Sequence, residues 1–304
     1  MQTIIENRSI EDLWKKSISE CKQKVLENVI LNGEFNIEEI DSNFIKLKKK
    51  EASMWQNKEK PNELIINHGE YIYKGDASNL GIEFIIQELK KKTYGNRACY
   101  SLINMEDIIN SGDEAIPSFM VLQFSFSKED KDKLIVSAYF RALEVKEFLP
   151  INLAEICLNI EKIKQNFPNI KTFELTIFLF RAQYIEGFNC LRHSKLDILK
   201  ATTMVKYLFT DKKQIVEALR DKYRVVESVI ITRGIENLME AVETVDEDVL
   251  HNKTNIQNQL SHILSIMNEI RTMRENTSIQ EQIDIKTDDL QKELSILIEF
   301  MEGQ

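Results

Sequence analysis

Residues 116–152 read IPSFMVLQFSFSKEDKDKLIVSAYFRALEVKEFLPIN, and this stretch decides the fold of the 304-residue chain. Two segments in which apolar and polar residues alternate flank a turn of acids and lysines at residues 128–133. Such alternation around a short polar turn is typical of a β-hairpin. Gln123, Arg141 and Asn152 lie among apolar residues, and buried polar groups need hydrogen-bond partners. The pattern therefore predicts a sheet that carries a ligand cavity.

The spacing of this stretch matches a known family. Pro117 is followed by Gln123 and Phe124 at the family's spacing, and the next matches fall in step without a gap: Leu134, Tyr139, Arg141, Glu144, Pro150 and Asn152. On these residues the chain resembles the thymidylate synthase and deoxycytidylate hydroxymethylase family over roughly residues 10–200. Asn96-Arg97 resembles the family's paired arginines, and residues 178–184 resemble its strand ending in His, one residue, Tyr.

The chain also departs from the family's pattern. Ser118 stands at the position of the catalytic cysteine, and Phe119 stands at its neighbouring histidine. Other family residues are replaced by Asn96, Ala142, Glu144 and Ala182. No arginine lies between Arg8 and Arg97 to match the phosphate-loop arginine, and the family's catalytic glutamate has no clear counterpart. Because a serine hydroxyl without an activating base is a weak nucleophile, we expect little or no synthase activity.

The resemblance implies a set of ligand-binding residues. Arg141 matches the family's sheet arginine, and Arg97 matches one of its paired arginines, which are donated across a dimer. Both kinds hold the nucleotide phosphate, and planar guanidinium forks suit that task. Gln123, Asn152 and Tyr184 complete the expected site, with Asn152 reading the pyrimidine edge and Tyr184 contacting the sugar. The alternative is that these residues are structural relics. Arg141 would then pair with Glu144, and Asn152 would cap the helix that follows Pro150.

Composition limits the function classes. A formal net charge of -9 disfavours general nucleic-acid binding, which needs a basic surface. No apolar run approaches the ~20 residues that span a bilayer, and the first residues lack a signal pattern, so we expect a cytoplasmic protein without a membrane segment. The four histidines and four cysteines are scattered, and this predicts no metal site.

Local patterns predict the elements before residue 200. Ser9 with Asp12 opens a helix whose apolar spacing continues through Val29, and Asn32-Gly33 ends it. Residues 34–70 are predicted to form short strands and loops, with the lysine run 46–50 as a solvated strand edge. Further helices are predicted at 76–92 and 152–165, and a strand at 173–184.

The remaining residues, 201–304, contain no proline and little glycine, which predicts a helical C-terminal extension. Residues 212–220 are charged and helical, whereas 224–232 could form a strand or a helix. Val249, Ile256, Ile263 and Ile270 recur every seven residues. A break near 275–277 and a capping-box pattern of Ser278 with Glu281 precede a second apolar helix. The two helices could form a hairpin within the chain or a coiled coil between subunits.

Together these features predict an α+β fold of the thymidylate synthase type: a twisted mixed sheet with flanking helices in residues 1–200, and the helical extension in 201–304. The first functional hypothesis is a catalytically lapsed pseudoenzyme that needs no cofactor, binds a deoxynucleotide, possible ligands being pyrimidine deoxynucleotides, or another nucleotide-like ligand, and acts as a sensor or scaffold. It would be a homodimer with a protein partner at residues 246–301. A second hypothesis is an active (hydroxy)methyltransferase that uses methylenetetrahydrofolate, and a third is a purely structural dimerisation protein. Ser118 disfavours the enzyme.

Overall fold

The computed structural model describes residues 2–74, 81–112, 114–225, 230–276 and 279–303. The chain divides into two compact units, the first formed by Met1–Pro61, Ile66–Asn110 and Ile116–Cys190, and the second by Asn62–Ile65, Ser111–Ala115 and Leu191–Gln304. The division falls at Leu191, whereas the sequence places it after residue 200. The residues just after Leu191 belong to the second unit because Leu196 is buried in its core.

The first unit contains a mixed seven-stranded sheet in the order β1-β2-β7-β5-β4-β3, with the short β6 paired to β7. The strands are β1 (Gln2–Ile5), β2 (Leu26–Asn36), β3 (Cys99–Ser101), β4 (Phe119–Phe126), β5 (Lys133–Phe140), β6 (Leu143–Glu144) and β7 (Thr172–Gln183). β4 and β5 form the predicted antiparallel hairpin, with Leu122 opposite Ala138. β7 runs parallel to β5 and antiparallel to β2. The α+β prediction with a mixed sheet is confirmed.

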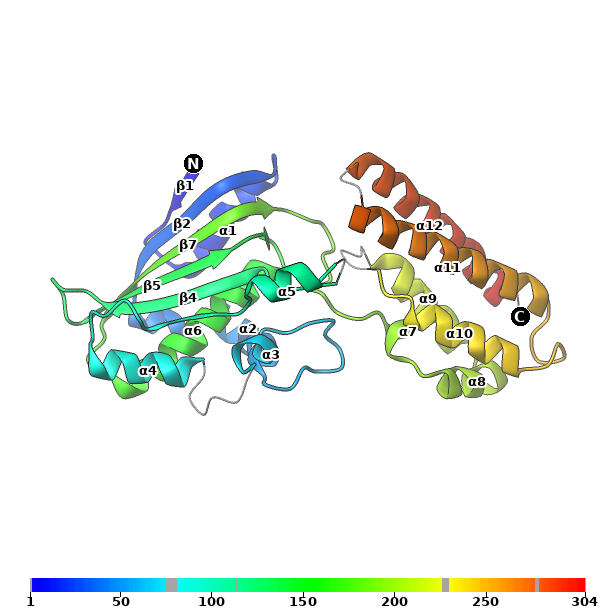
Figure 1. Ribbon diagram of the computed structural model, residues 1–304, viewed down its shortest axis with the longest axis horizontal. Helices are drawn as coiled ribbons and strands as arrows, with labels where there is room; N and C mark the ends of the chain where they lie inside the picture. The colour runs from blue at the N-terminus through cyan, green and yellow to red at the C-terminus, as the bar shows by residue number, and fades with distance from the viewer. Residues whose placement is uncertain (1, 75–80, 113, 226–229, 277–278, 304) are drawn as a thin grey trace. The chain divides into compact units, whose positions relative to one another are not determined.

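Helices cover one face of this sheet, and Figure 1 shows α2, α4 and α6 along that side. The helices of the unit are α1 (Ile10–Cys21), α2 (Asn43–Gln56), α3 (Gly69–Ile72), α4 (Ile82–Lys91), α5 (Met105–Asn110) and α6 (Phe148–Asn166), with a 3-10 turn at Ile37–Asp41. Alternate strand residues such as Phe124, Val136 and Leu175 are buried beneath them. The opposite face is open, and Tyr139, Phe178 and Phe180 are exposed on it.

Two predictions before residue 60 are wrong. The first helix ends at Cys21, and residues 26–36 form β2, because Leu31 and Phe35 pack into the sheet core. Residues 43–56 form helix α2 instead of strands. Ile45, Ala52 and Trp55 are its buried residues, so the lysine run 46–50 lies on a helix and not on a strand edge. Of the helix predicted at 76–92, Ile82–Lys91 is described as α4, whereas 76–80 lie outside the described residues.

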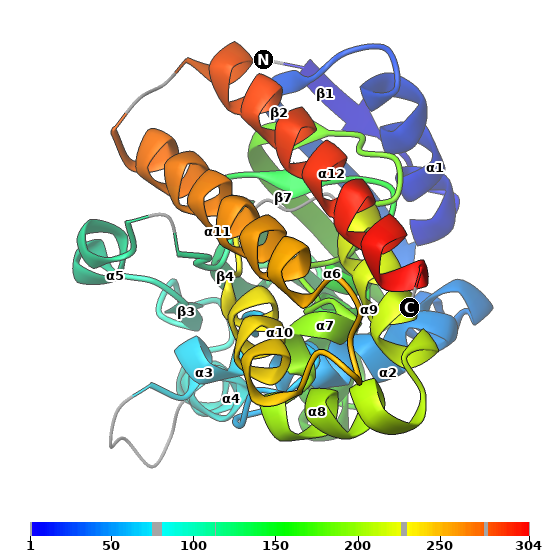
Figure 2. The same ribbon diagram turned by 90° about the vertical axis from the view of Figure 1, so that its right-hand side faces the viewer.

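The second unit is helical. It comprises α7 (Lys195–Ile198), α8 (Ala201–Thr210), α9 (Lys213–Arg224), α10 (Arg233–Thr244), α11 (Lys253–Asn276) and α12 (Gln280–Glu302). The heptad residues Ile256, Ile263 and Ile270 are buried in one core with α12 and the shorter helices. Figure 2 shows α11 and α12 running side by side, so these helices form the hairpin within the chain. Ser278 of the capping-box pattern and residues 226–229 lie outside the described residues.

Across the described ranges, no helix combines the length and the apolar character needed to cross a membrane.

Candidate functional site

Arg141 lies at one end of the sheet, directly after β5, and is half-buried. Its Nε and Nη2 groups donate to the carbonyl oxygens of Pro117 and Ile116, at 3.3 and 3.0 Å. Its backbone N–H donates to the Ser118 carbonyl at 3.0 Å. Burial lowers the pKa of Arg141, although a guanidinium stays charged in proteins. Arg141 therefore positions the segment that carries Ser118, and part of its donor fork is still available.

The expected pairing of Arg141 with Glu144 is not what the structure shows. The buried Glu144 carboxylate accepts the backbone N–H groups of Lys146, Glu147 and Phe148 at 2.7–3.1 Å, and that of Ile185 at 3.3 Å. The first three of these groups lie at the N-terminus of α6, where unsatisfied N–H groups favour an anion. Within the described residues, no carboxylate forms an ion pair with Arg141.

Asn152 does not cap α6, because the helix begins at Phe148 and Asn152 lies in its second turn. Its side chain is fully buried, and its Nδ2 donates to the Phe148 carbonyl at 2.8 Å. Its Oδ1 has no hydrogen-bond partner. Asn152 thus presents an unpaired acceptor inside the core and not to a surface ligand.

Tyr184 follows β7 at the same end of the sheet as Arg141. Its hydroxyl donates to Glu186, and the ammonium groups of Lys22 and Lys146 lie 5.4 and 5.6 Å from its ring centre. The hydrogen bond to Glu186 is the main cause of the raised pKa of Tyr184. Two cations therefore flank a tyrosine near the carboxyl ends of β5 and β7.

Arg97 and Gln123 lie elsewhere. Gln123 is in β4, opposite Cys99 of β3 and Ser137 of β5, and its Nε2 donates to the Asn96 carbonyl at 3.0 Å. Arg97 is exposed in the segment that leads into β3. In one chain the structure thus gathers Ser118, Arg141 and Tyr184 at the sheet end, and it does not bring Arg97 and Gln123 to them.

Sequence reasoning missed a buried histidine and glutamate. His68 Nδ1 lies 2.8 and 3.1 Å from the two carboxylate oxygens of Glu155, and both side chains are fully buried. Burial raises the pKa of Glu155, and His68 partly offsets this. The imidazole ring contacts Trp55 at 4.8 Å and, edge to face, Phe119 at 5.5 Å between ring centres. An oriented imidazole therefore lies beside the residue next to Ser118.

The backbone around His68 is pressed against the end of α2. Asn67 Nδ2 donates to the Asn57 carbonyl at 2.6 Å, and the His68 N–H donates to the Trp55 carbonyl at 2.8 Å. A Cβ on Gly69 would lie 1.7 Å from the Asn57 carbonyl oxygen, so glycine is required there. Asn67-His68-Gly69 is the one local signal that could have drawn attention to this histidine.

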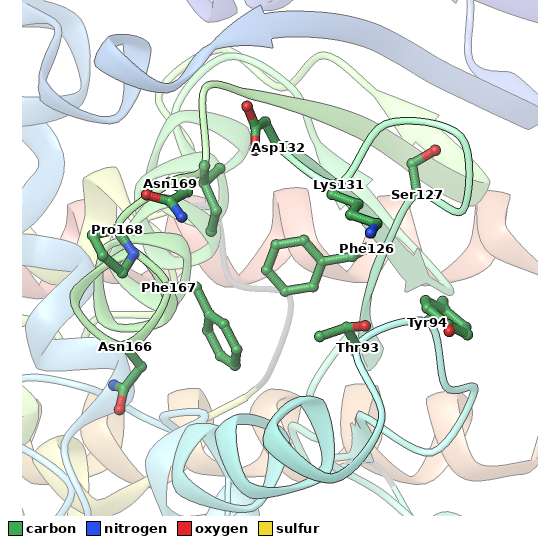
Figure 3. A pocket seen from close by; sticks show the side chains of 11 residues that line it. Thr93, Tyr94, Phe126, Ser127, Lys131, Asp132, Asn166, Phe167, Pro168 and Asn169 are labelled. Atoms are coloured by element: carbon green, nitrogen blue, oxygen red, sulfur yellow. The ribbon is translucent and has the colours of Figure 1, made fainter.

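A separate pocket of about 560 Å³ lies at the opposite end of the β4–β5 hairpin from Arg141. Figure 3 shows Phe126 and Phe167, whose ring centres are 5.2 Å apart, with Tyr94 and Lys131 at its rim. The pocket contains none of the residues that the sequence analysis assigned to a site.

No protein-family model matches the chain, and no curated protein matches it. Among solved structures, the chain is similar to thymidylate synthase from T4 phage, with 22% identity and a TM-score of 0.29. The match covers 34% of this chain and 35% of the phage enzyme, so the chain spans about a third of that protein's length. A likeness of this size does not establish the family.

Proposed function

We propose that the first unit binds an anionic, nucleotide-type ligand at the sheet end that carries Arg141. The observation that supports this most is a half-buried guanidinium with no carboxylate partner among the described residues. Two backbone carbonyls occupy only part of its five N–H donors. A phosphate would complete the fork with charge-assisted bonds. Lys22 lies near Tyr184 at the same end, and so does Lys146, which is paired with Glu186 and Glu147.

In this proposal the protein binds the ligand but does not catalyse a reaction on it. Ser118 has no hydrogen bond to a histidine or carboxylate among the described contacts, so nothing activates its hydroxyl as a nucleophile. Asn152 contributes no ligand contact, because its side chain is enclosed in the core. The proposal needs no folate cofactor, and the helical second unit would transmit the bound state to a protein partner through residues 246–301.

We further propose that the open face of the sheet is the contact between two copies of the chain. Ile30, Phe178, Tyr139 and Val121 are directly opposite one another on β2, β7, β5 and β4, so they form an apolar row across this face. Phe178 is 41% exposed and Phe180 is 48% exposed. A continuous apolar row favours burial against a second surface. A dimer would also allow the partner's arginine to reach a site that Arg97 does not reach in its own chain.

Nucleotide binding is tested by thermal unfolding with dUMP, dCMP and dTMP and their ribose counterparts. A ligand at one hundred times its dissociation constant adds about 2.7 kcal/mol to the free energy of unfolding, so we expect a clear rise in Tm with at least one of them. Arg141→Ala removes the proposed phosphate contact and should abolish the rise. Calorimetric titration of the folded variants gives the affinities directly.

Arg181→Ala is the matched control. Arg181 is an exposed arginine of β7 that pairs with Glu27, and its loss should leave the rise in Tm unchanged. A rise that persists in Arg141→Ala would refute the assignment of the phosphate to Arg141. The absence of a rise with every nucleotide would refute the binding function and favour a structural protein. If binding is seen, tritium release from C5 of the bound base tests the alternative of an active transferase.

The dimer is tested by Phe178→Glu, which places one carboxylate from each of the two copies in the proposed contact. Loss of a buried aromatic anchor and like-charge repulsion together weaken association by at least roughly 100-fold. We expect light scattering after size exclusion to show a dimer for the unmodified protein and a monomer for the variant. Phe209→Glu, at an exposed phenylalanine of α8, should leave the dimer intact. A monomeric unmodified protein would contradict the proposal.

A further inference from the structure

The pocket at the Phe126 end of the β4–β5 hairpin has no part in the function proposed above. Its volume of about 560 Å³ lies within the range of roughly 300–1,000 Å³ that is typical of small-molecule sites. The residues after α4, the end of β4 with its turn, and the residues after α6 form it. The Phe126 N–H donates to the Thr93 carbonyl at 2.8 Å, and the Lys171 N–H donates to the Asp132 carbonyl at 2.8 Å. These backbone bonds hold the three segments together, so the pocket is part of the folded unit.

Aromatic side chains form the apolar part of the pocket. The rings of Phe126 and Phe167 lie 5.2 Å apart, and Figure 3 shows Thr93 and Tyr94 on the neighbouring segment. Phe126 and Ile170 are 7% and 3% exposed, whereas Tyr94 is 51% exposed. Aromatic rings attract one another in offset or edge-to-face arrangements. A buried aromatic wall beside an exposed tyrosine therefore suits a flat aromatic ligand.

The charges around the pocket favour an anion. Lys131 lines it, and in the part of the chain that the structure describes its ammonium group has no hydrogen bond or ion pair. Asp132 is the carboxylate among the described lining residues, and it is paired with Lys171 at 2.6 Å. Lys90 lies at the same rim, because its Nζ donates to Asn166 Oδ1 at 2.7 Å. A cationic ligand would meet like charges here, whereas an anion would meet the unpaired ammonium of Lys131.

We propose that this pocket binds a small aromatic acid. The flat ring lies against Phe126 and Phe167, and the carboxylate accepts a charge-assisted hydrogen bond from Lys131. Further polar side chains of the lining, without a hydrogen bond in the described residues, are Thr93, Tyr94 and Asn169. The site is separate from the sheet end that carries Arg141, so each of the two can be tested without the other.

Three indoles that differ in charge test the class of ligand: indole-3-acetate, indole-3-acetamide and tryptamine. Each is titrated into the isotope-labelled full chain while the backbone amide signals are followed by NMR. We expect indole-3-acetate to shift the amides of Phe126, Ser127, Phe167 and Ile170 with a Kd of roughly 1 mM or below. The neutral amide should bind about 3-fold more weakly, and tryptamine more weakly still. If indole-3-acetate binds no more tightly than the other two, the assignment to an acid is overturned. If none of the three shifts these amides, the site itself is overturned.

Two lysines of the same turn separate the proposed contact from a general effect of charge. Lys131→Gln should weaken the binding of indole-3-acetate about 3-fold and leave that of indole-3-acetamide unchanged. Lys128→Gln is the matched control, because Lys128 is exposed and is not among the lining residues, and it should change neither affinity. An equal loss in both variants would refute the contact with Lys131.

A third variant fills the pocket. Asn169 is exposed on the lining, so Asn169→Trp should place its ring in the pocket and abolish the binding of indole-3-acetate, with an unchanged Tm as evidence that the variant is folded. Binding that survives in this variant would contradict the proposed site. Arg141→Ala should bind indole-3-acetate like the unmodified protein, so this result does not depend on nucleotide binding.

Discussion

Replacing Lys222 with methionine is expected to lower the free energy of unfolding of the second unit by about 3–5 kcal/mol. Lys222 Nζ donates to both carboxylate oxygens of Asp197 at 3.0 and 3.1 Å, and to the Ile231 carbonyl at 2.9 Å. Both charged side chains are fully buried. Methionine has a similar shape but no charge, so it leaves the Asp197 carboxylate in the core without its cation.

Asp197 forms contacts that join three helices, and this makes the expected loss of unfolding free energy large. Ser194 at the start of α7 donates to its carboxylate at 2.7 Å, and Arg233 of α10 donates to its carbonyl at 3.0 and 3.2 Å. A Cβ on Gly234 would lie 2.6 Å from the Asp197 Oδ1, so α10 approaches too closely for any other residue. Lys222 comes from α9, and its removal therefore weakens the contacts of α7, α9 and α10 at once.

The control is a surface pair in the same unit. Lys286 and Glu269 form an ion pair at 2.8 Å, and both are partly exposed. Lys286→Met should cost less than about 1 kcal/mol. Since both tryptophans lie in the first unit, far-UV circular dichroism and hydrogen exchange of α7, α9 and α10 report on the second. If Lys222→Met is no more destabilising than Lys286→Met, the buried pair is not what holds these helices together. Lys222→Met with Asp197→Asn should recover part of the loss.

Local periodicity predicted some elements well. The β4–β5 hairpin, β7 and the helices α9, α11 and α12 have strong repeats, and their main errors lie at the ends, whereas α7, α8 and α10 follow only from the general prediction of a helical extension. The predicted first helix extends to Asn32-Gly33 because Val25 and Val29 fit its spacing, whereas Val29, Leu31 and Phe35 equally fit alternate positions of a strand. Pairing with β7 decides between them, and no local pattern contains that pairing.

The site residues show a second reason why local sequence patterns did not predict the whole structure. His68 and Glu155 are separated by 87 positions, so no spacing rule connects them. Glu155 reads as one more residue of an apolar helix, and only the packing of α2 on α6 places His68 beside it. Family spacing located Arg141 at the sheet end, but it could not show that two backbone carbonyls occupy part of the guanidinium. Contacts between segments that are distant in the sequence could therefore not be predicted from it.

His68→Leu is expected to lower the free energy of unfolding of the first unit by about 3–5 kcal/mol at pH 8, since it leaves the buried Glu155 without a partner. The loss should be smaller at pH 5. Burial raises the pKa of Glu155 above its ordinary value of 4.5, and His68 partly lowers it again. Removal of His68 therefore raises the pKa of Glu155 further. A carboxyl with a raised folded pKa stabilises the fold fully below its unfolded pKa, and this contribution is lost as the pH rises through the folded pKa.

Urea unfolding followed by tryptophan fluorescence measures this at both pH values, because the Trp55 ring contacts His68. The double variant His68→Leu with Glu155→Met removes the imidazole together with the carboxyl group and should regain most of the loss, without the added pH dependence. Glu155→Gln keeps the shape of the glutamate and should likewise be insensitive to pH in this range. An equal loss for His68→Leu at pH 5 and pH 8 would show that His68 acts by packing against Trp55 and Phe119, and that the charge of Glu155 is not the cause.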